Sequence, residues 1–251
     1  MSGHSHWATI RRKKGANDAK KGASFTRLAR EIVMAARNGG SDPDTNFRLV
    51  LAIEKARAGN MPKDNIERAI RRGAGEDKDG AIFEEITYEG FGPHGVALVM
   101  DCVTDNRNRA VAEIRHLLSR SGGNMAEAGS VSWQFSRNSY FAFPKSQLNF
   151  DKAFELALEA GAEDVQEDGD NIEIVGPVDA FKKISDALIK AGVTPDDAEL
   201  RMIAKQDIEL GVDDTLSVLR VVESLEELDD IQSVFHNLKI SDEALAALEA
   251  E

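Results

Sequence analysis

The chain has 251 residues, of which 42% are hydrophobic, and a formal net charge of -13 at neutral pH. This length allows two or three domains with hydrophobic cores. The sequence contains no apolar run of the ~18 residues that a membrane span needs, its N-terminus lacks the apolar core of a signal peptide, and Cys102 is its only cysteine. We therefore expect a cytoplasmic protein with no membrane contact, no internal disulfide, no zinc site built on several thiolates and no cofactor.

Charge is divided unevenly along the sequence. Residues 1–73 hold 16 Lys/Arg against 7 Asp/Glu, whereas residues 74–251 hold 15 against 37. This asymmetry predicts a basic module that binds a polyanion, attached to acidic domains that the same polyanion repels. The alternative is that the basic module is only solvated, or that it contacts the acidic part of its own chain.

Residues 1–16 predict a flexible arm, because their cationic run repels itself and they contain few apolar side chains. A helix is predicted from Asn17 or Asp18 to about Asn38, ahead of the pair Gly39 and Gly40. Its apolar side chains fall on one face. We expect that face to rest on a core and the opposite face to present cations outward, namely Lys20, Arg27, Arg30 and Arg37.

Two further helices complete the basic module. One is predicted to begin near Asp42 and Pro43 and to end near Gly59. The other follows the turn NMPKDN, and the spacing of Asp64 and Glu67 predicts a capping box at its start. The Gly- and charge-rich residues 73–80 form the predicted linker.

Beyond residue 80 the pattern changes to short strands between helices. ITYEGF and VALVMDCV predict an antiparallel pair, and VSWQF and YFAF a second pair. The remaining predicted elements are helices over 108–121, 152–160, 178–191 and 215–225, strands near 163–166, 172–175, 199–203 and 231–235, and a helical tail. This order favours an α+β fold with two ferredoxin-like (split βαβ) domains after a three-helix domain.

The first α+β domain shows only two strands and a helix before residue 130, so we expect the last helix and strand to complete its sheet. This predicts domains at residues 1–75, at 80–130 with 207–240, and at 131–206, with the third domain inserted in the second. The alternative is a simple tandem arrangement.

No residue pattern favours an enzyme. Cys102 lies in an apolar run, which is typical of an inert buried thiol. If Cys102 were a catalytic nucleophile, its partner would be His94 or His116. The acidic residues occur mostly as adjacent pairs, whose side chains diverge and rarely converge on one metal. His4 offers an N-terminal copper or nickel site that we take as accidental. The loop GFGPHG precedes a strand and predicts a hairpin turn, not a phosphate loop.

The cationic residues remain as the candidate site, and their chemistry suits contacts to phosphate groups of nucleic acid. A helix-turn-helix motif with its turn at GGSDP remains an alternative interpretation. The predicted nucleic-acid-binding residues are Trp7, Arg11, Arg12, Lys13, Lys14, Lys20, Lys21, Arg27, Arg30, Arg37, Arg71 and Arg72.

Long segments of the sequence closely resemble the YebC/PmpR family: GHSHW, RKKGANDAKKGASFTRLAREI, NMPKDNIERAIRRG, ITYEGFGPHGVAL, TDNRNR and GGNMAEAGSVSWQF. The match runs from Gly3 to Phe135 and continues weakly to the end. His94 stands where the family pattern predicts Gly. The resemblance implies a helical domain followed by two related α/β domains, without enzyme activity.

The resemblance implies two competing roles. Bacterial members are commonly described as DNA-binding transcriptional regulators, whereas the mitochondrial relative is a translational activator and some bacterial members are linked to stalled ribosomes. The expected partner is therefore duplex DNA or ribosomal RNA, together with ribosomal or transcription proteins. The physical features of the sequence do not choose between them.

Overall fold

The computed structural model describes residues 18–76 and 82–250, and the side chains of 25–76 and 82–248. The chain folds into two compact units. Among the described residues, one unit contains 18–76, 82–128 and 219–234, and the other contains 129–218 and 235–250. The predicted fold class is confirmed: three helices are followed by two α/β sheets.

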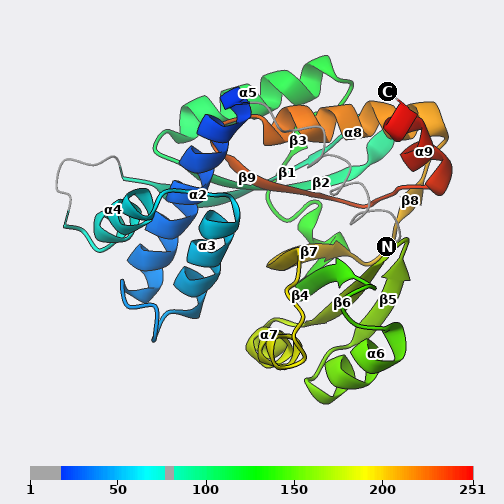
Figure 1. Ribbon diagram of the computed structural model, residues 1–251. Coiled ribbons are helices and arrows are strands. Elements are labelled where there is room, and N and C mark those ends of the chain that lie inside the picture. The colour runs from blue at the N-terminus through cyan, green and yellow to red at the C-terminus, as the bar shows by residue number, and fades with distance from the viewer. Residues whose placement is uncertain (1–17, 77–81, 251) are drawn as a thin grey trace. The chain divides into compact units, whose positions relative to one another are not determined.

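Three helices open the first unit (Figure 1): α2 (Asp18–Gly39), α3 (Phe47–Ala58) and α4 (Lys63–Gly73). Their apolar faces form one core, in which Ile32, Leu49 and Ile66 are buried. Phe83 and Val103 belong to the same core although they lie outside the three helices. The helices are therefore packed on the part of the chain that forms the first sheet.

The starts of α3 and α4 differ from the predictions. The Asp42 carboxylate accepts from the Asp44 amide at 3.0 Å and holds a turn. Helix α3 begins only after Asn46, whose side chain accepts from the Leu49 amide at 3.1 Å. Helix α4 has Pro62 at its N-cap and no side-chain cap. The predicted capping box is wrong, because α4 begins at Lys63 and Asp64 lies in its first turn; Glu67 pairs with Lys63 at 3.6 Å instead.

The first sheet has the strand order β3-β1-β2-β9. Its strands are β1 (Glu84–Phe91), β2 (Ala97–Thr104), β3 (Asn124–Ala126) and β9 (Ile231–His236). Helix α5 (Arg107–Arg120) and the end of α8 (Val212–Glu226) cover one face (Figure 1). Strand β9 arrives more than 100 residues after β3, so this sheet is completed by a late part of the chain, as the sequence analysis predicted.

The hairpin between β1 and β2 turns through Pro93–Gly95. His94 occupies the left-handed region at φ 58° and ψ 18°. This is the position at which the family pattern predicts Gly, which adopts such angles without steric cost.

The second sheet has the strand order β5-β6-β4-β7 and is antiparallel throughout. It contains β4 (Phe135–Pro144), β5 (Asp164–Asp168), β6 (Asn171–Pro177) and β7 (Asp197–Ala204), with helices α6 (Phe150–Glu159) and α7 (Phe181–Lys190). This is the split βαβ arrangement. The prediction of two strands from VSWQF and YFAF is wrong, because Ser132–Gln134 form a 3-10 turn and Phe135–Pro144 one strand.

Short elements complete the second unit. Strands β8 (Ile208–Glu209) and β10 (Leu238–Lys239) form a parallel pair, and α9 (Asp242–Ala250) follows. The domain boundaries drawn from the sequence, at 75, 80, 130, 207 and 240, stay a prediction.

Candidate nucleic-acid interface

The predicted site residues divide into two groups. Trp7, Arg11, Arg12, Lys13 and Lys14 lie outside the described residues. Lys20 and Lys21 lie on α2, but their side chains are also outside the description. The other five arginines have described side chains: Arg27, Arg30, Arg37, Arg71 and Arg72.

Arg30 does not face outward. Its side chain is 12% exposed, and its Nη1 pairs with the Asp230 carboxylate at 2.9 Å. The same nitrogen donates to the backbone oxygens of Asp229 and Val103. The prediction that α2 presents Arg30 to solvent is therefore wrong, because carboxylate and carbonyl acceptors from distant parts of the chain hold its guanidinium.

Arg27 is likewise half-buried, and its Nη2 donates to the backbone oxygen of Glu226. Burial lowers the pKa of Arg27, while the charge of Asp229 opposes this shift. Glu226 is the last residue of α8, whose final carbonyls have no N–H donors within the helix. Arg27 thus caps the C-terminus of α8, and its predicted outward orientation is also wrong.

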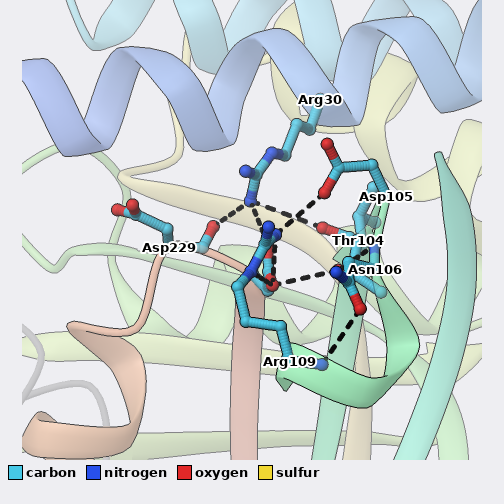
Figure 2. A network of polar contacts seen from close by, with 8 residues as sticks. Arg30, Thr104, Asp105, Asn106, Arg109 and Asp229 are labelled. Carbon is cyan, nitrogen blue, oxygen red and sulfur yellow. Dashed lines mark hydrogen bonds and ion pairs between the residues drawn. The ribbon is translucent and has the colours of Figure 1, made fainter. Parts of the chain in front are cut away.

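The Asp230 carboxylate organises the polar network drawn in Figure 2. Besides Arg30, it accepts from the Thr104 hydroxyl at 2.9 Å and from Nε and Nη2 of Arg109 at 3.2 and 2.9 Å. Its side chain is only 3% exposed. These hydrogen bonds join α2, the end of β2, the start of α5 and the start of β9.

The residues of TDNRNR (104–109) supply most of this network. Asp105 pairs with Arg109 at 2.8 Å, and this hydrogen bond lowers the pKa of Asp105. The Asn106 side chain caps α5 by accepting from the Arg109 amide, and its own amide donates to Thr104. The hydrogen bond to Asp230 raises the pKa of Arg109. In the sequence this segment indicated only the family resemblance, and its role in joining the elements was not predicted.

The remaining arginines gather at Phe83 or stay exposed. Nη1 of Arg37 donates to the Phe83 carbonyl at 2.8 Å, and the Arg72 guanidinium lies 4.8 Å from the centroid of the Phe83 ring. Arg71, in the last turn of α4, is exposed. The structure therefore leaves Arg37 and Arg71 on the surface of the helical region.

Other cations of the helical region pair with carboxylates. Arg48 forms an ion pair with Glu85, which raises the pKa of Arg48, and Lys55 pairs with Glu31 at 3.2 Å. Arg57 and Arg68 are exposed and were not among the predicted site residues. The prediction took its residues from the arm, from α2 and from the last turn of α4, and so omitted them.

The catalytic alternative depends on Cys102. Cys102 is buried, and burial raises the pKa of its thiol to about 12, so it remains protonated at neutral pH. Within residues 18–76 and 82–250, no group of three His, Cys, Asp or Glu side chains is placed to hold a metal ion. No helix in the described part of the chain is long and apolar enough to cross a membrane.

The fold and charge define a class: a multidomain α+β protein with a basic helical N-terminal region and two α/β sheets. Residues 5–76 match the model of the TACO1/YebC N-terminal domain, and residues 83–238 match that of the TACO1/YebC second and third domain. The chain belongs to the TACO1/YebC family.

Relatives and a solved structure agree with this assignment. A protein of Geotalea uraniireducens is 47% identical over 98% of both chains, and one of Acidithiobacillus ferrooxidans is 49% identical over 100% of this chain and 99% of the relative. Both are named "Probable transcriptional regulatory protein". The crystal structure of a conserved hypothetical protein from Aquifex aeolicus is 39% identical, with a TM-score of 0.82 over 90% of this chain and 93% of that chain.

Proposed function

We propose that this protein is a non-enzymatic, cytoplasmic regulator of gene expression that binds duplex DNA through its basic N-terminal region. The observation that carries the proposal is the segregation of charge, with a net excess of cations in residues 1–73 and of anions in the remainder. Such a distribution attracts nucleic acid to one end of the molecule and orients the rest away from it. The name of the relatives, probable transcriptional regulatory protein, supports the same role.

The described arginines refine the expected contacts. Arg27 and Arg30 hold other parts of the chain together, so we assign them no phosphate contact. The proposed DNA-binding residues are Trp7 and the cations of the arm, two lysines near the start of α2, and three arginines in the last turns of α2 and α4. They are Trp7, Arg11, Arg12, Lys13, Lys14, Lys20, Lys21, Arg37, Arg71 and Arg72.

The test is a titration of fluorescently labelled duplex DNA, followed by anisotropy at several salt concentrations. If about six phosphates are contacted, log K should fall against log salt with a slope near -5. A regulator should also prefer its target over random DNA by about 10³-fold or more. Selection from a random duplex library would identify that target.

A matched pair of variants tests the role of the arm. Charge reversal of Arg11, Arg12, Lys13 and Lys14 to Glu should abolish binding while the circular dichroism spectrum stays unchanged. The control reverses four exposed lysines of the second unit, which gives the same change in net charge: Lys152, Lys182, Lys183 and Lys190. Equal losses of DNA affinity in both variants would show that net charge alone causes the loss, and would contradict a localised interface.

A cellular measurement addresses the choice of nucleic acid. Protein isolated at mild salt should be released from its partners by DNase. Release by RNase alone, with cosedimentation of the protein and ribosomes, would reject DNA as the target and favour the translational role instead.

A further inference from the structure

Helix α5 carries cations that the rest of the described chain leaves unpaired. It has four arginines and one acid, Glu113, although acids outnumber Lys/Arg by 37 to 15 in residues 74–251. Arg115, His116 and Arg120 are exposed, and their side chains form no hydrogen bond or ion pair with the described part of the chain. The two guanidinium groups therefore keep all their N–H donors for an acceptor outside the chain.

Helical periodicity brings these side chains to one side of α5. At about 100° per residue, four exposed positions fall within an arc of about 140°, which we call the outer face of α5: Arg115, His116, Ser119 and Arg120. The opposite side is buried, since Ile114 is only 1% exposed. Along the helix axis the two arginines are about 7.5 Å apart, and the Ser119 hydroxyl adds a donor between them.

The start of α5 is fixed to α2, the longest helix of the proposed interface. Arg30 of α2 and Arg109 of α5 donate to the same carboxylate, that of Asp230. The Asn106 side chain caps α5, and both helices belong to one compact unit (Figure 1). The outer face of α5 is thus part of a rigid element, so a ligand that binds there does not have to order a loop.

We propose that the outer face of α5 is a second contact for the sugar-phosphate backbone of the nucleic acid that the basic N-terminal region binds. The proposal rests on the proposed function, because it adds a surface to the same complex. Duplex DNA carries one phosphate charge per about 1.7 Å of its axis, so a helix that lies along the backbone meets phosphate groups at Arg115 and at Arg120. Contacts of this kind position a protein without reading the base sequence.

A solvated helix face predicts a different behaviour. Exposed cations often contact only water, and Arg120, in the last turn of α5, also interacts favourably with the helix dipole. In that case, replacing the arginines would change stability slightly and leave the affinity for nucleic acid unchanged. A binding measurement therefore separates the two roles.

The experiment titrates labelled duplex DNA with the full-length chain and with the double variant Arg115→Gln/Arg120→Gln. The loss of two phosphate contacts should reduce the magnitude of the slope of log K against log salt by about 1.8, and weaken binding roughly 30-fold at 0.15 M salt. The loss should be the same on target and random DNA. The control Lys182→Gln/Lys190→Gln removes two exposed cations of α7 and should bind like the wild-type chain. Normal binding by the α5 variant would overturn the second contact and leave the proposed function intact.

A second readout locates the contact directly. Ser119→Cys places a thiol on the outer face of α5 for a benzophenone maleimide, whereas Cys102 is buried, and burial raises the pKa of its thiol to about 12, which keeps it unreactive. Light should crosslink the labelled Ser119→Cys chain to DNA, and it should not crosslink a chain labelled through Lys190→Cys on α7. Equal yields at the two positions would contradict a localised contact.

Ribosomal RNA separates failure of the second contact from failure of the proposed function. If the wild-type chain binds no duplex DNA, the proposed function fails. The crosslinking measurement is then made with ribosomal RNA. A crosslink from the labelled Ser119→Cys chain alone supports the α5 contact, and the absence of a crosslink to either nucleic acid overturns it.

Discussion

Arg30 and Asp230, 200 residues apart in the sequence, form an ion pair of 2.9 Å with side chains that are 12% and 3% exposed. The same carboxylate accepts from Thr104 and Arg109. Asp230 therefore links α2 to the end of β2 and to the start of α5.

Asp230→Asn should lower the free energy of unfolding by about 3–5 kcal/mol, because it leaves the guanidinium of Arg30 without its charge partner in a buried site. Urea denaturation followed by circular dichroism measures the change. Asp229→Asn is the control: its backbone oxygen, not its carboxylate, accepts from Arg30, and we expect a change within about 0.5 kcal/mol. Equal effects of the two variants would contradict the central role of Asp230.

Gly73→Ala should destabilise the first unit by about 1–3 kcal/mol, because the added methyl group overlaps the Val33 carbonyl and the Ala36 side chain. Gly211→Ala is the matched control, since nothing lies within 4 Å of its added Cβ. The control should be neutral or slightly stabilising. Thermal unfolding of both variants gives the comparison, and a neutral Gly73→Ala would show that α2 and α4 can separate without cost.

His94→Gly should raise the free energy of unfolding by up to about 1 kcal/mol, because glycine adopts φ 58° without the steric cost that a Cβ atom carries. His94→Val should lower it, since a β-branched residue tolerates this region least. Chemical denaturation ranks the three chains. If valine proved as stable as glycine, the turn would have another conformation in solution.

Glu173→Gln should stabilise the protein at neutral pH. Burial raises the pKa of Glu173, whose carboxylate accepts from the Tyr140 hydroxyl at 2.5 Å. The native state therefore holds its proton more tightly than the unfolded chain, and the wild-type protein loses stability as the pH rises from the unfolded pKa to the native pKa. The advantage of the variant should be full above both values and vanish below about pH 4, near the ordinary pKa of 4.5. Urea midpoints between pH 4 and 8 test this, and a difference independent of pH would contradict it.

Helices and strands were predicted well where apolar periodicity and turn residues within the segment determine them. The apolar face of α2 and its glycine stop gave Asp18–Gly39 to within a residue, and the β1–β2 hairpin followed from alternation and its turn. The start of α3 was misplaced because Asp42 and Asn46 compete as caps, and both choices satisfy local rules. Strand β3, with three residues, carries too little pattern to be recognised.

The site was harder to predict than the fold. A helical wheel correctly groups Arg30 with the other cations of α2, yet it contains no information on an acceptor 200 residues away. Arg37 is exposed, as its place opposite the apolar face of α2 predicted, and Arg71 in the last turn of α4 is exposed as well. Nothing in the local sequence marks Phe83 as the meeting point of three arginines.

The late arrival of β9 has a consequence for biosynthesis. While the chain is being translated, α2 emerges early, but its acceptors at residues 226–230 emerge after the whole second sheet. Until then the two arginines of α2 stay hydrated and the first sheet lacks an edge strand. The first unit can therefore complete its folding only in the last stage of synthesis. A premature stop after residue 218 would remove β9 and the acceptors of Arg27 and Arg30.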